Sequence, residues 1–355
     1  MYFAVNATAL RASGALTILK QFLDKAENTS NKYIVFISDD VVLERSYKNV
    51  IIKRLAPKGW LRRIYWDFIG FDNRIKSLDV NIDKVISLQN TTVNTRLPQI
   101  IYLHQPIPFS NVKFSMTNIS GFKLSLYKWF YSYFIFLFSR SDTRFFVQTK
   151  WMKEAVCSGF NIEESRVYIS KPDINLPILT RFDSGLKKNV TTYIYPATYL
   201  PYKNHIVLIK ALSLTKKEIH SGEKVTLQVT LKEDEFQKLH SLAKKYGVSS
   251  QIQNLGVLKY EDLLEKYMQS DGLLFPSFLE TYGLPLVEAA ALGKRILCSD
   301  LPYARDVLEG YEGVDYIPHN NPRAWAEKIR TEKSEVTYIW EAPNRPTWDN
   351  FFNNL

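Results

Sequence analysis

Short apolar segments alternate with longer segments of helical periodicity along almost the whole chain. This alternation is typical of βα units, in which helices cover both faces of a parallel sheet. The pattern lapses once, over residues 171–189, where Pro, Asp and Gly interrupt it, and then it begins again. It therefore predicts two α/β domains in tandem, over residues 1–180 and 190–340. An aromatic segment at residues 345–355 predicts a last helix that packs back on the first domain.

The predicted strands place the candidate site residues, because ligands of open α/β sheets bind beyond the carboxyl ends of the strands. In the first domain the predicted strands are Tyr2–Val5, Tyr33–Ile37, Lys84–Leu88, Ile100–Leu103 and Phe145–Val147. In the second domain they are Thr192–Tyr195, Val225–Leu231, Ile252–Leu255, Gly272–Phe275, Arg295–Cys298 and Asp315–Ile317.

The segment FPSFLETYGLPLVEAAALG, residues 275–293, is the strongest candidate for a binding site. A strand ends at Phe275, Glu280 lies in the following loop, and Pro285 suits the first turn of a helix. The backbone N–H groups at this helix start favour an anion such as a diphosphate, and they belong to Thr281, Tyr282, Gly283 and Leu284. The carboxylates of Glu280 and Glu288 can accept hydrogen bonds from sugar or ribose hydroxyls. From these residues alone, two solvated acids beside a well-capped helix are an equally good interpretation.

Glu280 and Glu288 form a Glu-x7-Glu motif, and the run around them resembles the donor-site signature of retaining glycosyltransferases of the GT4 family. The flanking text NLGVLKYEDLLEKYMQSDGLLFPS, the downstream SDLPYARDVL and YPATYLPYKNH at residues 195–205 resemble the same family. The likeness is close over residues 190–330 and looser before them. It implies the GT-B architecture, in which two Rossmann-like, doubly wound α/β domains face each other across a cleft. The first domain would bind the acceptor and the second the nucleotide sugar.

The resemblance also assigns roles within the second domain. Glu288 would bind the ribose of the nucleotide, and Glu280 would bind the hydroxyls of the transferred sugar. Lys203 matches the lysine that neutralises the donor diphosphate. Many family members have an arginine five residues before that lysine, but this chain has Thr198 there. Either one positive charge is missing or another residue supplies it.

Two residues of the first domain are further candidates. Gly14 lies in RASGAL, residues 11–16, which resembles the family's glycine-containing loop under the donor phosphates; from the residues alone, it predicts a simple turn between the first strand and the first helix. His104 follows the strand IIYL, where an imidazole faces the crevice and can donate to a hydroxyl. The family places a histidine in this region beside the transferred sugar. His205 more simply packs within a helix.

Neither a metal nor another cofactor is expected beyond the nucleotide-sugar substrate. The chain has no Asp-x-Asp pair, and the adjacent Asp39 and Asp40 would diverge at the end of a strand. Lys203 and the helix-start amides can stabilise the leaving diphosphate instead. No residue is nominated as a nucleophile. The resemblance implies attack on the face from which the diphosphate departs, with a donor phosphate oxygen as the base.

The amino-acid composition indicates the cellular compartment and the kind of partner that the protein has. The only cysteines, Cys157 and Cys298, lie far apart with no metal-ligand spacing, which favours a reducing cytoplasm over a disulfide scaffold or a zinc site. The pattern of the N-terminal residues predicts a strand rather than a signal peptide. The most apolar run, Trp129–Phe138, has about half of the ~20 residues that a transmembrane helix needs. The formal charge of +10 favours an anionic partner.

Two aromatic segments of the first domain have alternative interpretations. Residues 121–140 predict a helix with a wide aromatic face, either a core element, which is the preferred interpretation, or an interfacial helix that meets lipid. A second cluster suits anionic headgroups or a polyprenyl-diphosphate acceptor, but also single-stranded nucleic acid or a solvated basic helix with a buried face. This cluster consists of Lys53, Arg54, Lys58, Arg62, Arg63, Arg74 and Lys76, with Trp60, Tyr65, Trp66, Phe68 and Phe71.

The combined features favour one function. The chain is expected to be a retaining, metal-independent hexosyltransferase that moves a sugar from a UDP-, GDP- or dTDP-linked donor. The acceptor would be a polyprenyl-diphosphate-linked saccharide of O-antigen, lipopolysaccharide or capsule assembly, reached at an anionic membrane surface by a cytoplasmic, peripheral protein on the inner face of the cytoplasmic membrane. A GT-B nucleotide-sugar epimerase is the alternative. A basic nucleic-acid-binding protein is disfavoured, because no recognised motif supports it, and nucleic acid is not expected as a partner.

Overall fold

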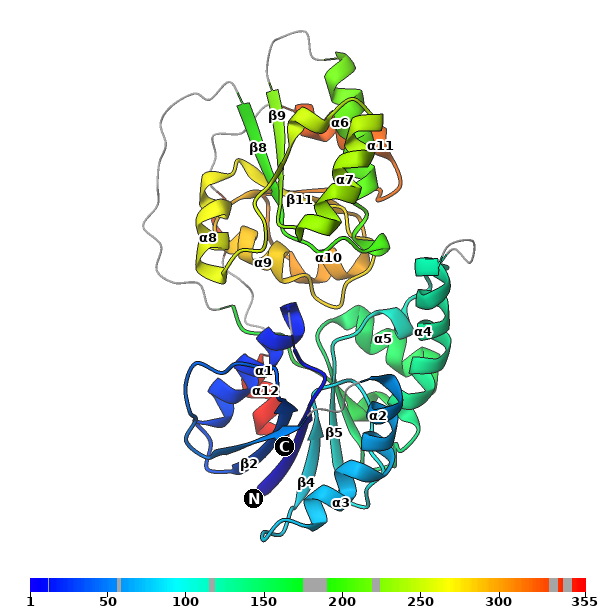
Figure 1. The fold of residues 1–355 in the computed structure, drawn as a ribbon, viewed down its shortest axis with the longest axis vertical. Coiled ribbons are helices and arrows are strands. Elements are labelled where there is room, and N and C mark those ends of the chain that lie inside the picture. Colours follow the sequence, from blue (N-terminus) through cyan, green and yellow to red (C-terminus); the bar gives the residue numbers. More distant parts are fainter. Residues whose placement is uncertain are drawn as a thin grey trace. The chain divides into compact units, whose positions relative to one another are not determined.

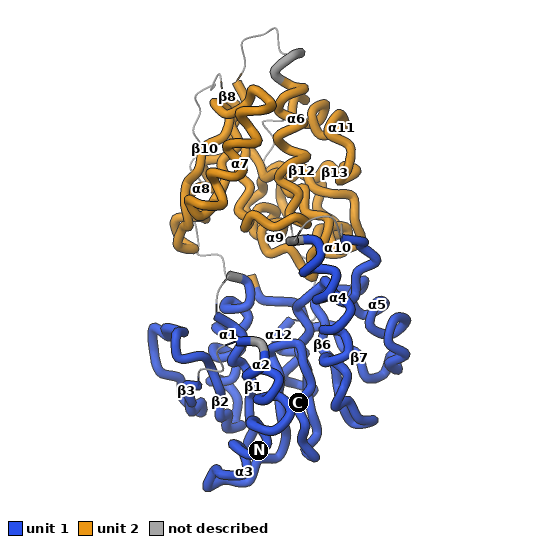
Figure 2. Tube along the Cα trace, turned by 45° about the vertical axis from the view of Figure 1, so that its right-hand side comes forward, with its two compact units in different colours: residues 1–173, 345–355 blue, residues 174–344 orange. Residues whose placement is uncertain are grey.

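The computed structural model describes residues 1–11, 13–55, 59–114, 119–174, 190–218, 224–331, 338–340 and 347–355. The chain divides into two compact units (Figure 2). Unit 1 comprises residues 1–173 and 345–355, and unit 2 comprises residues 174–344. Most of the predicted linker lies outside the described residues.

Unit 1 is built on a seven-stranded parallel sheet, counted over the described residues, in the order β3-β2-β1-β4-β5-β6-β7 (Figure 1). The strands are β1 (Tyr2–Ala7), β2 (Lys32–Ser38), β3 (Val50–Leu55), β4 (Lys84–Ser87), β5 (Gln99–Leu103), β6 (Arg144–Val147) and β7 (Val167–Ile169). The helical elements are α1 (Ser13–Ala26), α2 (Trp60–Tyr65), the π-helical turn η1 (Trp66–Gly70), α3 (Phe71–Lys76), η2 (Ile107–Phe109), α4 (Ile119–Phe136), α5 (Lys150–Phe160), η3 (Glu164–Arg166) and α12 (Trp348–Asn353).

Unit 2 repeats this plan with a six-stranded parallel sheet among its described residues, in the order β10-β9-β8-β11-β12-β13. The strands are β8 (Val190–Tyr195), β9 (Lys224–Val229), β10 (Ile252–Asn254), β11 (Gly272–Phe275), β12 (Arg295–Ser299) and β13 (Val314–Ile317). The helical elements are η4 (Pro201–Lys203), α6 (His205–Glu218), α7 (Glu233–Lys245), η5 (Ser249–Gln251), α8 (Tyr260–Gln269), α9 (Leu284–Ala291), α10 (Pro302–Val307) and α11 (Pro322–Arg330). Both sheets have the doubly wound order of a Rossmann-like fold.

Every predicted strand is present, and the predicted doubly wound α/β class is confirmed. The central strands are recognisable in the sequence because helices bury both their faces, so they are continuous apolar runs; Phe3, Ala4 and Val5 of β1 are fully buried. Strands β3 and β7 were not predicted from the sequence. Both lie at the edges of the sheet, where β3 carries the charged residues Lys53 and Arg54. Lys53 and Arg54 therefore belong to an edge strand and not to the solvated basic helix that was considered for them.

The C-terminal helix α12 packs into the core of unit 1. The Trp348 ring stacks on the Tyr102 ring with 4.8 Å between centroids, and its indole nitrogen donates a 2.9 Å hydrogen bond to the Gln21 side chain. Phe351 is fully buried and packs its ring against Phe146. The aromatic residues near the end of the chain are thus part of the first unit, although they follow the second unit in the sequence.

Two local interpretations are wrong. Gly14 was expected in the turn after the first strand, but it lies in the first turn of α1, because that helix begins at Ser13. Residues 121–140 were interpreted as a core helix, but only one side of α4 is buried and its other side is exposed to solvent. Ile135 is fully buried, whereas Trp129 is 80% exposed. The reason is that the sheet covers one side of α4 only. Among the described residues, no helix has the length and apolarity needed to cross a bilayer.

Candidate active site

The candidate site of unit 2 lies where the strand order of its sheet reverses. The chain leaves β8 toward β9 on one side and enters β11 on the other, so the loops after β8 and β11 diverge at their carboxyl ends. Such a switch point is the general ligand site of open α/β sheets. Lys203 follows β8 and Glu280 follows β11, which brings the two predicted residues to the same edge.

Hydrogen bonds hold the two loops together. The carbonyl oxygen of Tyr202 accepts from the Phe278 N–H at 2.9 Å and from the Ser277 hydroxyl at 3.2 Å. The Asn204 amide donates to the carbonyl oxygens of Pro276 at 3.2 Å and His319 at 2.8 Å. Asn204 has a positive φ of 57°, which asparagine tolerates, and it ends the η4 turn before α6 begins. The side chains that these loops carry are therefore held at a defined separation.

Lys203 and Glu280 form an ion pair at this point. The Lys203 Nζ atom lies 2.5 Å from Glu280 Oε1, and the two side chains are only 18% and 13% exposed. The backbone of Lys203 is also fixed, because its carbonyl oxygen accepts a 2.7 Å hydrogen bond from the Tyr195 hydroxyl. Partial burial weakens the screening of such a pair by water. An ammonium group and a carboxylate at the same switch point can receive a phosphate and a sugar hydroxyl side by side.

The helix that follows Glu280 begins as the sequence predicts. Gly283 is the N-cap residue of α9, and Leu284 and Pro285 form its first turn. Thr281 and Tyr282 link Glu280 to this cap, and the Tyr282 side chain is buried. Gly283 has φ +84° and ψ +63°, a left-handed conformation that glycine adopts without strain. The helix start and the ion pair thus belong to one short segment after β11.

Replacing Gly283 by alanine is expected to destabilise unit 2 by about 1–2 kcal/mol, because the left-handed backbone then strains a Cβ atom. That Cβ would also meet Leu286 Cδ1 at 3.3 Å and the Phe275 ring at 3.6 Å. Gly310 is the matched control for backbone strain alone. It has a similar φ of +76°, but a Cβ atom added there would meet nothing within 4 Å. Urea unfolding should show the larger loss for Gly283→Ala. Equal stability of Gly283→Ala and the parent protein would contradict the expected strain.

Glu288 lies in a different environment from Glu280. It is buried on α9 and faces α8, where the Tyr267 hydroxyl donates to Glu288 Oε2 at 3.1 Å. Burial raises the pKa of Glu288 to about 7, against the opposing effect of hydrogen bonds from Tyr267 and Tyr260. These two tyrosine partners of Glu288 were not predicted from the sequence. Glu288 is therefore a carboxyl group poised between its neutral and charged forms near neutral pH.

The remaining candidates of unit 2 lie around Lys203. Thr198 is exposed in the loop after β8, and its short hydroxyl side chain cannot supply the charge of an arginine. His205 begins α6 and is buried between the rings of Tyr195 and Tyr199, at centroid distances of 4.7 and 5.4 Å. Burial, with a smaller effect of Lys203, lowers the pKa of His205 to about 3. His205 is thus a neutral packing residue, as the sequence analysis considered.

In unit 1, His104 lies at the carboxyl edge of the sheet, just after β5. Its Nε2 atom is 2.8 Å from the Leu88 carbonyl oxygen, which can only accept, so Nε2 carries the hydrogen. The His104 N–H donates to the Asn90 side-chain oxygen at 2.6 Å. Burial lowers the pKa of His104, so the ring is neutral at pH 7. Gly14 is exposed near the start of α1, with nothing within 4 Å of a built Cβ.

A buried polar cluster at the switch point of unit 1 escaped the sequence analysis. Asp67 accepts hydrogen bonds from Asn6 Nδ2 at 3.1 Å, Gln89 Nε2 at 2.9 Å and Thr91 Oγ1 at 3.0 Å. Burial raises the pKa of Asp67 to about 7. Asn6 is in β1 and Gln89 follows β4, the two strands between which the order reverses. The available signal was the polar run QNTT directly after an apolar strand.

Potential metal ligands do not gather within the described ranges, where no group of three His, Cys, Asp or Glu side chains has metal-binding geometry. Asp39 and Asp40 are both exposed after β2, and Asp40 pairs with Arg11 at 3.4 Å. Cys157 and Cys298 are free thiols.

Comparison with known proteins identifies the fold. The structure aligns with a crystal structure of WaaG, a glycosyltransferase involved in lipopolysaccharide biosynthesis, with a TM-score of 0.66 and 15% identity over 93% of this chain and 90% of that one. Two doubly wound parallel sheets with this alignment define the GT-B fold. The model of the family "Glycosyl transferases group 1" matches residues 179–335, and over these residues the chain is similar to that family. The resemblance inferred from the sequence is confirmed.

Two curated relatives indicate the setting in which such domains occur. The capsular polysaccharide biosynthesis glycosyltransferase CapH of Staphylococcus aureus is 25% identical over 163 residues, which are 45% of this chain and 45% of CapH. The O-antigen chain mannosyltransferase RfbU of Salmonella typhimurium is 21% identical over 285 residues, or 78% of this chain and 71% of RfbU. The match thus spans less than half of CapH. The comparisons give the epimerase alternative no support.

Proposed function

We propose that this protein is a retaining hexosyltransferase that moves a sugar from a nucleotide-sugar donor onto a lipid-linked saccharide in bacterial surface polysaccharide biosynthesis. The observation that carries the proposal is the Lys203–Glu280 pair, 2.5 Å apart at the switch point of unit 2. Both residues lie within the segment that matches the model of the glycosyl transferases group 1 family. The names of CapH and RfbU support the surface-polysaccharide setting.

The donor is held by charge and hydrogen bonds. Lys203 contacts the diphosphate, and the start of α9 at Gly283 and Leu284 directs its dipole toward the same group. Glu280 accepts from hydroxyls of the transferred sugar, which lie next to the diphosphate, and its pairing with Lys203 fits this adjacency. Glu288 accepts from the ribose. Because Lys203 supplies the positive charge, the proposal needs no metal ion or other cofactor.

Transfer then proceeds on one face of the sugar. A hydroxyl oxygen of the acceptor bonds to the anomeric carbon while the bond from that carbon to the diphosphate oxygen breaks, so the configuration is retained. The hydroxyl proton passes to an oxygen of the departing diphosphate. The Lys203 ammonium stabilises the negative charge that grows on this group, which is electrostatic stabilisation of the transition state. His104 is neutral, and because its Nε2–H is bound to the Leu88 carbonyl oxygen, its Nδ1 atom accepts a hydrogen bond from a hydroxyl near the transferred sugar.

The acceptor is a polyprenyl-diphosphate-linked saccharide, and the protein works as a peripheral protein on the inner face of the cytoplasmic membrane. The exposed aromatic side of α4 supports this placement, with Trp129 80% exposed and Tyr133 63% exposed. The chain's charge of +10 favours an anionic surface over a neutral one.

Donor screening followed by NMR tests the proposal. One of the UDP, GDP and dTDP sugars should raise the melting temperature, because a ligand at about 100 times its Kd stabilises the folded state by about 2.7 kcal/mol. With that donor and a lipid-linked saccharide, NMR should show a new glycosidic bond with the donor's anomeric configuration, in EDTA as well as in Mg²⁺. An inverted product would refute retention, and loss of turnover in EDTA would refute metal independence. Epimerisation of the donor without an acceptor would refute the transferase.

A further inference from the structure

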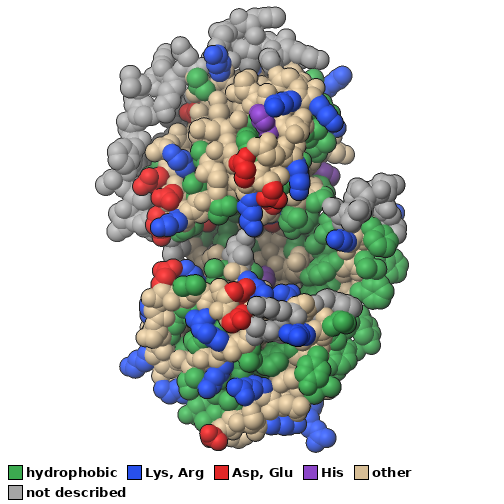
Figure 3. All heavy atoms as spheres, viewed as in Figure 1, with side chains coloured by type: hydrophobic (Ala, Val, Ile, Leu, Met, Phe, Trp, Pro, Cys, Tyr) green, Lys and Arg blue, Asp and Glu red, His purple; other side chains and the backbone are tan. Residues whose placement is uncertain are grey.

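Unit 1 exposes a large apolar surface on two neighbouring helical segments. The surface, here called the two-helix face, consists of Leu61, Tyr65 and Ile69 on α2 and η1 and of Phe122, Leu126, Trp129, Phe130 and Tyr133 on α4. Each of these side chains is between 47% and 80% exposed. Figure 3 shows hydrophobic side chains gathered over this side of unit 1, with basic side chains among them.

The two segments form one surface because their rings touch between them. The Phe68 ring of η1 lies 6.4 Å from the Phe134 ring and 4.8 Å from the Phe138 ring, between centroids. The exposed residues recur every three or four positions, so each set lies along one side of its helix. Isolated exposed apolar residues are ordinary, but a contiguous aromatic face of this kind marks an interaction site.

The charges beside the two-helix face indicate an anionic lipid surface as its partner. Arg62 and Arg63 are exposed on α2, and Lys123 is exposed on α4. The α4 segment, residues 119–136, contains no Asp or Glu. Asp67 of η1 is turned inward to Asn6, Gln89 and Thr91 in the polar cluster. Aromatic rings at headgroup depth with flanking cations are the side-chain pattern of proteins that lie on membranes.

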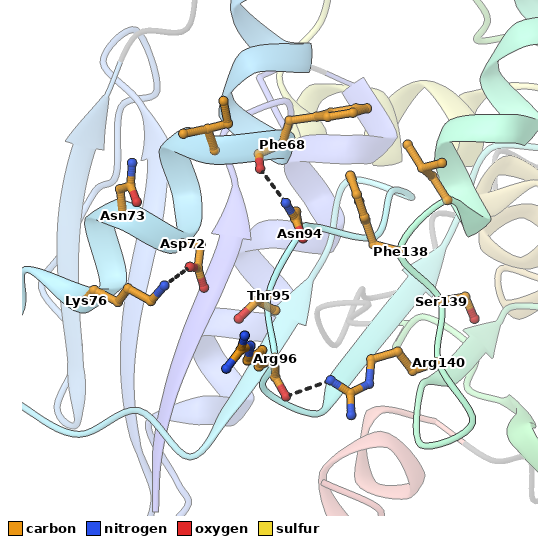
Figure 4. A pocket seen from close by; sticks show the side chains of 12 residues that line it. Phe68, Asp72, Asn73, Lys76, Asn94, Thr95, Arg96, Phe138, Ser139 and Arg140 are labelled. Atoms are coloured by element: carbon orange, nitrogen blue, oxygen red, sulfur yellow. Dashed lines mark hydrogen bonds and ion pairs between the residues drawn. The ribbon is translucent and has the colours of Figure 1, made fainter.

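A pocket of about 540 Å³ opens beside the two-helix face, between η1, α3, the loop before β5 and the end of α4. Figure 4 shows that its walls differ in character: Phe68 and Phe138 lie toward one end, and the guanidinium groups of Arg96 and Arg140 lie toward the other. Ile69 belongs both to this lining and to the two-helix face. An amphiphile can thus place its charged end among the arginines while its chain continues along the rings.

Three basic side chains and one acidic side chain line the pocket, and Arg140 also pairs with Asp142 outside the lining. Lys76 and Asp72 neutralise each other at 2.5 Å. Arg140 donates to the Arg96 carbonyl oxygen at 3.2 Å and lies 3.7 Å from Asp142, with half of its side chain exposed. No acceptor for the Arg96 guanidinium occurs in the described part of the chain, and Arg96 is exposed at the pocket. Two guanidinium groups with open donors match the oxygens of one phosphate group.

The pocket is separate from the polar edge that holds His104. Arg96 precedes β5 and Arg140 precedes β6, so both lie at the amino ends of the strands. His104 lies at the carboxyl end of β5, and five residues of strand span about 16 Å. A lipid phosphate in the pocket would leave the carboxyl edge open for the saccharide.

We propose that this pocket binds the phosphate headgroup of an anionic phospholipid while the two-helix face enters the surrounding bilayer. The inference extends the membrane-bound acceptor of the proposed function by naming the lipid class and the residues that contact it. Phospholipid binding requires neither donor nor acceptor, so it can be measured apart from sugar transfer.

Vesicle flotation tests the inference on the full chain. The protein should float with vesicles that contain phosphatidylglycerol but not with vesicles of phosphatidylcholine alone, and high salt should weaken binding. Combining Arg96→Gln with Arg140→Gln should lower the affinity about 30-fold, since each basic residue at an anionic surface contributes about 1 kcal/mol. Lys244→Gln with Lys245→Gln, which removes the same charge from the exposed end of α7, is the matched control and should change affinity less than twofold, by about a few tenths of a kcal/mol.

Three further results separate the pocket from diffuse attraction. Short-chain phosphatidylglycerol in solution should shift NMR signals of the parent protein but not of the double arginine variant. Trp129→Ser with Phe130→Ser should weaken vesicle binding, whereas Val257→Ser, at a position 71% exposed in unit 2, should not. Equal losses in the arginine and lysine variants would overturn the pocket, and self-association through the two-helix face without vesicle binding would overturn the membrane partner. Donor-induced thermal stabilisation in the same variants reports on the proposed function independently.

Discussion

Lys203→Ala is expected to lower kcat/KM for sugar transfer by about 10³-fold, because removing one preorganised group that stabilises a leaving oxyanion costs about 10²–10³-fold and a full charge lies at the upper end. The Nζ atom is only 2.5 Å from Glu280 and 18% of the side chain is exposed, so solvent screens this charge less than it screens a surface lysine. Initial rates at several donor concentrations provide the measurement. Lys203→Arg should recover part of the loss, since the charge remains and the geometry changes.

Two further variants serve as controls for Lys203→Ala. Lys238→Ala changes an exposed lysine on α7 and should leave turnover unchanged. Because Lys203→Ala also leaves the carboxylate of Glu280 without its partner, the double variant Lys203→Ala with Glu280→Gln shows whether the unpaired charge destabilises the fold. Circular dichroism and melting curves should show folded protein in each case. Full turnover in Lys203→Ala would remove the lysine from the mechanism.

Glu288→Gln is expected to gain about 3 kcal/mol of stability over the parent protein as the pH rises from 4.5 to 8. Burial raises the pKa of Glu288 from 4.5 to about 7 in the folded state. A raised folded pKa means that the stabilising effect of the neutral form is complete below pH 4.5 and is lost as the pH rises through 7. Raising the pKa of Glu288 from 4.5 to about 7 corresponds to about 3 kcal/mol. Urea unfolding of both proteins across this range measures the difference.

If Glu288 accepts from the ribose, donor binding should counteract the loss of stability of the parent protein at higher pH. Hydroxyl donors stabilise the carboxylate, so binding lowers the pKa of Glu288 and releases a proton near pH 7. Calorimetric titration in buffers of different ionisation enthalpy detects that release. Glu288→Gln should bind the donor without it. Asp67 also has a pKa raised to about 7, and Asp67→Asn separates its effect on the parent's pH profile. A stability difference for Glu288→Gln that does not change with pH would contradict the buried carboxyl group.

The class of fold and the segment proposed to bind the donor could be predicted from the sequence. Apolar strands such as Gly272–Phe275 were predicted with their ends in place, because a strand buried on both faces must be apolar over its whole length. Gly283, Pro285 and the Glu-x7-Glu spacing are local in the chain, and helix starts follow local rules. The edge strands β3 and β7 lack that constraint on one side, and the sequence analysis missed them.

Which side chains contact one another depends on the three-dimensional fold. Lys203 and Glu280 are separated by 77 residues, and their pairing depends on strand order and on the hydrogen bonds of Tyr202. The sequence shows Glu288 as an acid, but its raised pKa comes from burial against α8. The exposure of Trp129 likewise depends on what the sheet leaves uncovered. Periodicity is a property of neighbouring residues, whereas pairing, burial and exposure depend on segments that are distant in the chain and adjacent in space.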